Sequence, residues 1–176
     1  MIFKKATEEN IDVIMGIYDR ARDYMRANGN YIQWQNGYPS RAVVASDIKK
    51  EQLYICLEGE RIVAVFALDY SKDPLFATLT EGEWLNDDSY AVIRRIAVEG
   101  DMHNKNMGPL CFEYAFKQAC KHKVNNLRLI THKDNIAMLK AMEKFGFKYC
   151  GIVDLNDGHP RMAYQFTEKF CMMCMF

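Results

Sequence analysis

Residues Arg94 to Phe147 decide the fold, and they read RRIAVEGDMHNKNMGPLCFEYAFKQACKHKVNNLRLITHKDNIAMLKAMEKFGF. An apolar strand leads into a polar loop that ends at Gly108, and a helical run follows. The strand Leu127 to Thr131 comes next, before a second helical run that ends in Phe145-Gly146-Phe147. A loop that delivers backbone N–H groups to the start of a helix can hold a phosphate group. The order strand, polar loop, helix, strand, helix therefore predicts one anion-binding unit.

The loop itself reads His103-Asn104-Lys105-Asn106-Met107-Gly108, and the helix is expected to begin near Pro109. Proline suits a first helical position because its missing N–H has no partner there. Asn106 adopts a left-handed backbone more readily than most residues, and Gly108 lets a ligand approach closely. Two interpretations stay open for this loop: a pyrophosphate cradle, to which Lys105 and His103 add positive charge, or an ordinary connection between strand and helix.

The rest of the chain predicts a single α+β domain over residues 1–168, with a mixed central sheet flanked by helices. Gly59 marks a hairpin turn, Ser40 can cap a helix, and residues 71–89 are expected to form a polar loop. The predicted order is βααβββαβαββ, with strands at 2–6, 53–57, 61–70, 90–98, 127–131, 147–155 and 161–166, and helices at 7–27, 40–50, from 109, and 134–145. Residues 169–176 form an apolar tail that packs on the domain or on a partner, or is an artificial extension.

Composition limits the function classes. The 176 residues carry 23 Lys+Arg and 23 Asp+Glu, so the formal net charge is zero, and no basic stripe points to nucleic acid. No run approaches the roughly 18 apolar residues that span a bilayer. Residues Met1 to Lys5 are not followed by the apolar core of a signal peptide. We therefore expect a cytoplasmic protein that partners neither nucleic acid nor a membrane.

The six cysteines are Cys56, Cys111, Cys120, Cys150, Cys171 and Cys174. Most are expected to be buried free thiols, which pack as small hydrophobic groups. Cys171 and Cys174 have metal-ligand spacing, but a single pair without a second pair nearby is a weak zinc signal, so we predict no metal site.

Two segments resemble the Gcn5-related N-acetyltransferase (GNAT) family. Asn135, Leu139 and then Glu143-Lys144-Phe145-Gly146-Phe147 look like the family's helix from Asn to "Glu-Lys-x-Gly-Phe", and Arg95 to Val98 resembles its central strand. The family's phosphate loop is written Gln or Arg, two residues, Gly, one residue, Gly or Ala. Here His103 and Asn106 stand at the first two defined positions and depart from that pattern, whereas Gly108 matches it. The resemblance covers residues 1 to about 168 and implies the acyl-CoA N-acyltransferase fold.

The resemblance implies acetyl-CoA as the acyl donor, wedged where the strands of Ile96 and Leu129 splay apart. Backbone groups of Ile96 and Val98 would pair with the pantetheine arm, and an N–H near Val98 would polarise the thioester carbonyl. The amides of Asn104 through Gly108 would bind the pyrophosphate, and Asn135 would contact the arm or fix the local backbone. The implied cofactor-binding residues are Ile96, Ala97, Val98, His103, Asn104, Lys105, Asn106, Met107, Gly108 and Asn135.

No acid or base is evident from the sequence. The family often places a Tyr seven residues after the Asn, as general acid toward the thiolate, and Met142 occupies that position here. The strand positions that often carry a base hold Val92 and Arg94. Tyr90, at the entry to the strand, is the one weak catalytic candidate, and water-mediated deprotonation or a neutral incoming amine remain alternatives.

An aromatic segment precedes the second predicted helix, and in this family that region often forms part of the acceptor pocket. Its Tyr31, Trp34 and Tyr38 either close the core or shape an acceptor site. Arg94 either makes an intramolecular ion pair or pairs with a carboxylate of the substrate.

The sequence thus predicts an N-acetyltransferase that transfers acetyl from acetyl-CoA, by direct attack, to a primary amine of a small molecule or amino-acid-like acceptor. The alternative is a non-catalytic acyl-CoA-binding or regulatory protein on the same fold, which the missing acid and base favour. The oligomeric state is left open, with a homodimer among the possibilities.

Overall fold

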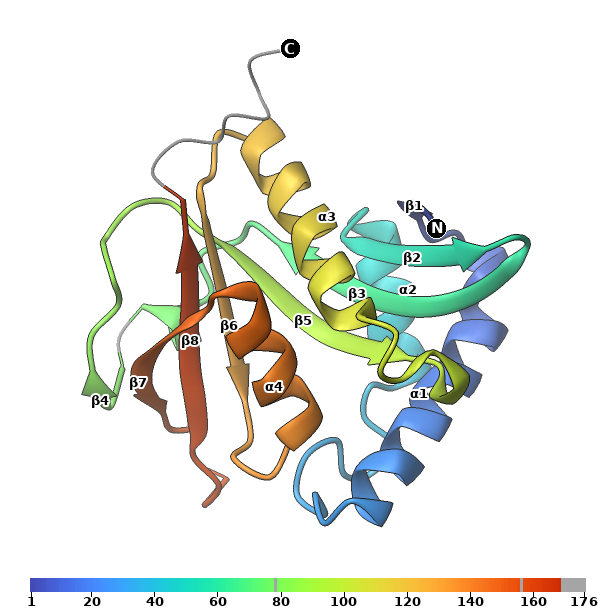
Figure 1. Cartoon of the computed structure of the whole chain (residues 1–176), viewed down its shortest axis with the longest axis horizontal. Helices are drawn as coiled ribbons and strands as arrows, with labels where there is room; N and C mark the ends of the chain where they lie inside the picture. The colour runs from blue at the N-terminus through green and yellow to red at the C-terminus, as the bar shows by residue number, and fades with distance from the viewer. Residues whose placement is uncertain (78, 156, 169–176) are drawn as a thin grey trace. The chain divides into compact units, whose positions relative to one another are not determined.

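A computed structural model describes residues 1–77, 79–155 and 157–168 (Figure 1). Contacts divide the chain into two compact units. Unit 1 comprises Met1–Leu68 and Arg94–Cys111, and unit 2 comprises Asp69–Ile93 and the chain from Phe112 onward. Strand β5 (Ala91–Val98) and helix α3 (Met107–Lys121) each run from one unit into the other.

Unit 1 contains an antiparallel set of strands and two helices. Strand β1 (Ile2–Lys5) pairs with β2 (Leu53–Glu58), which pairs with β3 (Arg61–Asp69), and β5 follows β3 in the strand order. Gly59, with φ of 61°, makes the predicted hairpin turn between β2 and β3. Helix α1 (Ile11–Ala27) follows a 3-10 turn over Glu8–Asn10, and α2 is Arg41–Lys49.

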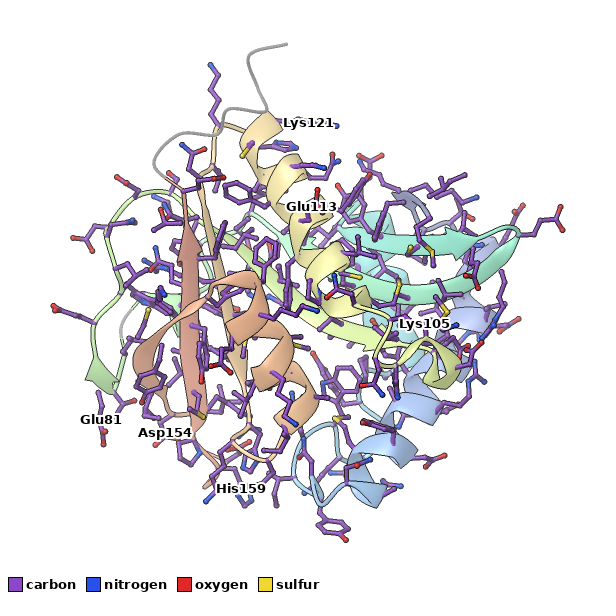
Figure 2. The ribbon with its side chains drawn as sticks, in the orientation of Figure 1. Glu81, Lys105, Glu113, Lys121, Asp154 and His159 are labelled. Carbon is purple, nitrogen blue, oxygen red and sulfur yellow. The ribbon has the colours of Figure 1, made fainter. Side chains whose placement is uncertain are left out.

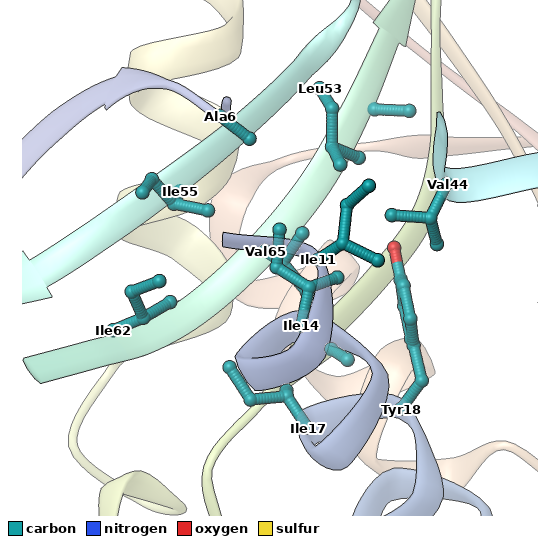
Figure 3. Packing of buried hydrophobic residues seen from close by; sticks show 12 residues of the cluster. Ala6, Ile11, Ile14, Ile17, Tyr18, Val44, Leu53, Ile55, Ile62 and Val65 are labelled. Carbon is teal, nitrogen blue, oxygen red and sulfur yellow. The ribbon is translucent and has the colours of Figure 1, made fainter. Parts of the chain in front are cut away.

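The core of unit 1 forms where α1 packs on β2 and β3 (Figure 3). Apolar residues of α1 recur at helical spacing, so that one face of the helix is buried. The strands contribute β-branched and small side chains. The buried cluster is Ala6, Ile11, Ile14, Ile17, Tyr18, Val44, Leu53, Ile55, Ile62, Val65, Ala67 and Ala97. Because Ala97 belongs to this cluster, the core holds the second half of β5 in place.

Unit 2 contains β4 (Glu81–Gly82), β6 (Asn126–Thr131), α4 (Ile136–Phe145), β7 (Lys148–Val153) and β8 (Arg161–Thr167). The start of β5 pairs with β6 in parallel, whereas β6–β8, β8–β7 and β7–β4 are antiparallel. The sheet is therefore mixed. Figure 1 shows α4 running beside β6 and β8. An aromatic cluster packs these elements together, and it consists of Phe112, Phe116, Phe145, Phe147 and Phe166.

The fold class, α+β with a mixed sheet and flanking helices, is confirmed, and three local predictions need correction. The polar loop 71–89 contains a 3-10 turn at Pro74–Phe76 and the extra two-residue strand β4. Strand β4 is possible because Gly82 and Gly151 come so close that a Cβ on either would overlap the opposite backbone. Helix α3 begins at Met107, two residues before Pro109, and α4 begins at Ile136 rather than Asp134.

The prediction for the cysteines can be checked for four of the six. Cys56, Cys111, Cys120 and Cys150 are buried free thiols, as expected, whereas the tail 169–176, with its cysteine pair, lies outside the described residues. No helix in the described part of the chain combines the length and the apolar character needed to cross a bilayer.

Candidate functional site

The loop between β5 and α3 has an unusual backbone. Asn104 has φ of 63° and Asn106 has φ of 62°, so two left-handed residues alternate with ordinary ones. Asparagine tolerates this region better than other residues with a side chain. The left-handed conformation predicted for Asn106 is therefore confirmed. This alternation turns the chain tightly just before α3.

The loop's N–H groups divide into two sets. Those of His103 and Lys105 bond inside the loop, to the carbonyls of Gly100 and Met102 at 3.2 Å each. The carbonyl of Asn106 accepts from Leu110, so α3 begins directly after it, and the N–H groups of Met107 and Gly108 belong to the first helical turn, which has no acceptor of its own. Pro109 falls in the same turn, where its missing N–H removes no helical bond. The donors left for a ligand at this end are helix-start amides.

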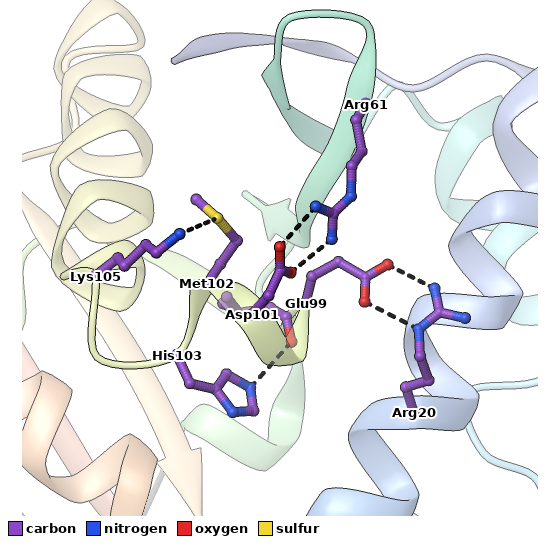
Figure 4. Close-up of polar contacts among 8 residues, drawn as sticks. Arg20, Arg61, Glu99, Asp101, Met102, His103 and Lys105 are labelled. Carbon is purple, nitrogen blue, oxygen red and sulfur yellow. Dashed lines mark hydrogen bonds and ion pairs between the residues drawn. The ribbon is translucent and has the colours of Figure 1, made fainter.

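Two ion pairs hold the stretch that leads into the loop (Figure 4). Arg20 of α1 makes two bonds to Glu99, at 2.9 and 2.6 Å, and Arg61 of β3 makes two to Asp101, at 2.7 and 2.6 Å. Hydrogen bonding to Arg61 lowers the pKa of Asp101 to about 2. Bidentate pairing of this kind restricts both partners. The loop is thereby anchored to α1 and β3.

The side chains of His103 and Lys105 in the loop are engaged in local contacts. His103 Nε2 lies 3.2 Å from the carbonyl oxygen of Val98, and since a carbonyl only accepts, Nε2 carries the proton. The His103 ring packs edge-on against Tyr24, with centroids 4.2 Å apart. Lys105, labelled in Figure 2, lies 3.6 Å from the sulfur of Met102. His103 therefore braces the loop against β5.

Strand β5 presents its backbone in a defined way. The N–H of Glu99 donates to the carbonyl of Val63 on β3, at 2.9 Å. Since successive N–H groups along a strand alternate between its two edges, those of Ile96 and Val98 point to the edge away from β3. Ala97 faces the core, where it is 4% exposed. The geometry thus suits the predicted roles of Ile96 and Val98, which stay predictions.

The sequence reasoning missed the most connected residue of the site, Arg95. Its guanidinium makes two 2.8 Å bonds to Asp47 of α2 and a third, at 3.1 Å, to the hydroxyl of Tyr38. Its backbone, at φ of 51°, is left-handed inside a strand, and the hydroxyl of Tyr18 donates to its carbonyl at 2.9 Å. The available signal of a buried pair was an arginine inside the mainly apolar strand β5, together with Asp47 on α2.

Burial shapes the ionisation of this cluster. Burial raises the pKa of the Asp47 carboxyl, and Arg95 opposes that shift. Burial also works against a charged Arg95, yet Tyr38 and Asp47 raise its pKa above the ordinary value. Burial raises the pKa of Tyr18 strongly, so that its phenol stays neutral. We take Asp47 and Arg95 to be an ionised pair because both charges are met by two short hydrogen bonds.

The predicted acceptor residues are only partly brought together. Trp34 packs edge-on against Tyr18, with ring centroids 5.4 Å apart, and Tyr38 joins the Arg95 cluster. Tyr31 is 67% exposed, so it does not close the core of unit 1. Arg94 adds positive potential that, like Arg95, opposes the rise in the pKa of Asp47 that burial causes. The segment Tyr31–Ser40 is thus both a core contact, through Trp34, and a surface that offers Tyr38.

The remaining candidates lie in unit 2. The Arg128 guanidinium lies 3.9 Å from the centroid of the Tyr90 ring and 4.1 Å from that of the Trp84 ring. The ring of Tyr90 therefore makes a cation–π contact with Arg128. The side chain of Asn135 accepts from the N–H of Met138 at 3.3 Å and caps α4, which is the backbone-fixing role that the sequence left open. Met142 is 0% exposed. The position where the family often has its acid is therefore part of the core.

Comparison with solved structures identifies the architecture. An acetyltransferase of the GNAT family from Streptococcus agalactiae 2603 superposes with a TM-score of 0.87 and 26% identity, covering 96% of this chain and 96% of that chain. The chain has the fold of the GNAT family of acetyltransferases. Two more distant GNAT-fold neighbours are PaiA N-acetyltransferase from Thermoplasma acidophilum in complex with coenzyme A (TM-score 0.72, 15% identity, 95% and 98% covered) and YncA, a putative acetyltransferase from Salmonella typhimurium with acetyl-CoA (0.68, 12%, 95% and 93%).

Comparison of the sequence with protein-family models and with curated proteins gives no match. The likeness to the GNAT family is accordingly one of three-dimensional structure. In the loop 103–108, His103 and Asn106 stand where the family pattern has other residues, while the backbone of the loop is tightly turned.

Proposed function

We propose that the protein is an acetyl-CoA-dependent N-acetyltransferase that acts on a primary amine of a small molecule or amino-acid-like acceptor. Structural neighbours named as acetyltransferases support acyl transfer, and two of them hold coenzyme A or acetyl-CoA. Within this chain the observation that carries the proposal is the loop Asn104–Gly108. Its helix-start amides, its tightly turned backbone and its ion-pair anchors directly after β5 support an anion site there.

The residues of unit 1 suit an acyl-CoA whose phosphates lie at the start of α3 and whose pantetheine arm lies along β5. The pyrophosphate would lie on the amides of Asn106 to Gly108 at the start of α3, where the helix dipole favours negative charge. The pantetheine arm would run back along the edge of β5 that carries the N–H groups of Ile96 and Val98. A prearranged backbone donor on that edge would stabilise the oxyanion that develops at the thioester. The acetyl group supplied by the bound donor is what an acceptor nitrogen would take.

Two measurements test this proposal. Calorimetry with CoA should show binding that is weakened in Gly108→Val, and loss of thioester absorbance from acetyl-CoA should follow addition of a suitable amine. The amine panel should contain polyamines, amino acids, aminoglycosides, arylamines and short peptides with a free N-terminus. Because the chain has its own cysteines, thioester absorbance is a cleaner readout than a thiol reagent.

The outcomes separate the possibilities. Binding together with turnover supports the enzyme, and the best acceptor then defines the substrate class. Binding without turnover across the whole panel supports the non-catalytic acyl-CoA binder. Absence of CoA binding removes both and leaves the fold alone.

A further inference from the structure

The Arg95 cluster contains one hydroxyl group, that of Tyr38, whose proton is available for donation. Asp47 and Arg95 are committed to each other, with side chains only 7% and 11% exposed. Tyr18 is wholly buried, and its hydroxyl donates a hydrogen bond to the Arg95 carbonyl. Tyr38 differs because it is 39% exposed and its hydroxyl accepts from Arg95 at 3.1 Å. A phenol that accepts one hydrogen bond still has its own proton to donate.

The surroundings of Tyr38 include a cation that can contact a negatively charged phenol oxygen. The titratable groups around it are Arg95 on β5, Asp47 on α2, and Tyr18 and Arg22 on α1; Arg22 donates to the Tyr38 backbone carbonyl at 3.2 Å. A phenolate formed here would keep its hydrogen bond to the Arg95 guanidinium, and that bond would become charge-assisted. Asp47 holds the guanidinium in the orientation that this requires.

The location matches the reacting end of the proposed acyl-CoA, and this step rests on the proposed function. With the phosphates at the start of α3, the arm runs from Val98 toward Arg94 along β5. A strand advances about 3.3 Å per residue, so the three steps from Val98 to Arg95 cover roughly 10 Å. An extended arm that pairs with Val98 and Ile96 would end close to the left-handed bend at Arg95. Tyr38 is hydrogen-bonded to that same residue.

We propose that Tyr38 is the general acid of the reaction and that Arg95 is the residue that positions it. The acceptor nitrogen forms a bond to the carbonyl carbon, the carbon–sulfur bond breaks, and the departing sulfur takes the proton of the Tyr38 hydroxyl. Arg95 stabilises the phenolate that remains. The nitrogen loses one proton as it becomes an amide, and water carries that proton back to the phenolate. No oxidation state changes. This assigns to Tyr38 the role for which the buried Met142 is unsuited.

The test compares Tyr38→Phe with the wild type, using the best acceptor from the amine panel, and with Tyr149→Phe as a matched control. Tyr149 is 53% exposed, lies on β7 and packs against Tyr164, so the control loses a surface phenol elsewhere. Tyr38→Phe should bind CoA within twofold of the wild-type Kd and keep its Tm, because only a partly exposed hydroxyl is removed. Its kcat should fall about 100-fold, the usual scale of general acid catalysis.

The split between kcat and KM separates an acid from a residue that merely shapes the pocket. An acid acts only when the thiolate leaves, so Tyr38→Phe should lower kcat while the KM for the acceptor stays within twofold of the wild type. A Tyr38→Phe kcat within threefold of the wild type, or a loss confined to the KM for the acceptor, overturns the assignment. Wild-type protein that binds CoA but transfers acetyl to no amine also overturns it, since no thiolate forms. Failure to bind CoA instead refutes the proposed function itself.

Discussion

Asp47→Asn should destabilise the protein far more than the same change at another carboxylate paired with arginine. Asp47 and Arg95 have side chains that are 7% and 11% exposed, so removing one charge leaves the other buried without its counter-ion. Breaking a buried pair costs about 3–5 kcal/mol. Asparagine retains one acceptor for the guanidinium, which places the expected loss of unfolding free energy near the lower end, about 3 kcal/mol.

The matched control is Asp12→Asn. Asp12 also pairs with an arginine, Arg41, but these side chains are 83% and 61% exposed. Exposed pairs contribute about 0–1 kcal/mol. For a chain of this size each kcal/mol moves Tm by about 2–4 °C. Asp47→Asn should therefore lower Tm by about 6–12 °C and Asp12→Asn by less than about 4 °C.

The assay is thermal unfolding followed by circular dichroism, with urea denaturation at 25 °C to obtain the free energies directly. The m-value of each variant checks that unfolding remains comparable. Equal Tm losses for the two variants, or a loss below about 2 °C for Asp47→Asn, would refute the reasoning. That result would mean that the Asp47–Arg95 pair is accessible to water.

Three further outcomes are expected. Gly108→Val should weaken CoA binding at least tenfold in calorimetry by crowding the helix-start amides, whereas Gly100→Val, where a side chain meets open space, should bind as the wild type does; equal affinities would count against the loop. Met142→Tyr should lower stability by about 1–3 kcal/mol in urea unfolding without raising kcat, because the site is fully buried and cannot take a larger polar side chain; a gain in turnover would disprove this. Carboxyl NMR should show Asp101 titrating near pH 2. The stabilisation from its pairing with Arg61 is then complete above the ordinary pKa of 3.8 and is lost as the pH falls through 2. In Arg61→Ala the midpoint should return toward 3.8, and an unchanged midpoint would exclude the ion pair.

Local sequence signals predicted what local chemistry controls. Ser40 caps α2 by accepting from the N–H of Val43 at 3.3 Å, as its position before the helix indicated. Gly59 makes the hairpin turn, and Asn106 takes the left-handed conformation that precedes α3. Each of these depends on a few consecutive residues, so the sequence contains the needed information within one turn. The order of strands and helices was predicted for the same reason, apart from β4, whose two residues are too few to form a pattern.

Only the tertiary structure could decide which side chains meet. Arg95 bonds to Asp47 and Tyr38 across 48 and 57 residues of sequence, and no periodicity encodes such a distance. Counting along the chain likewise placed Met142 where an acid was expected, but packing of α4 buries it completely. Secondary structure follows from short-range backbone preferences that the amino-acid order states directly. The assembly around Arg95 follows from burial, which makes a lone charge costly and so selects partners from anywhere in the chain.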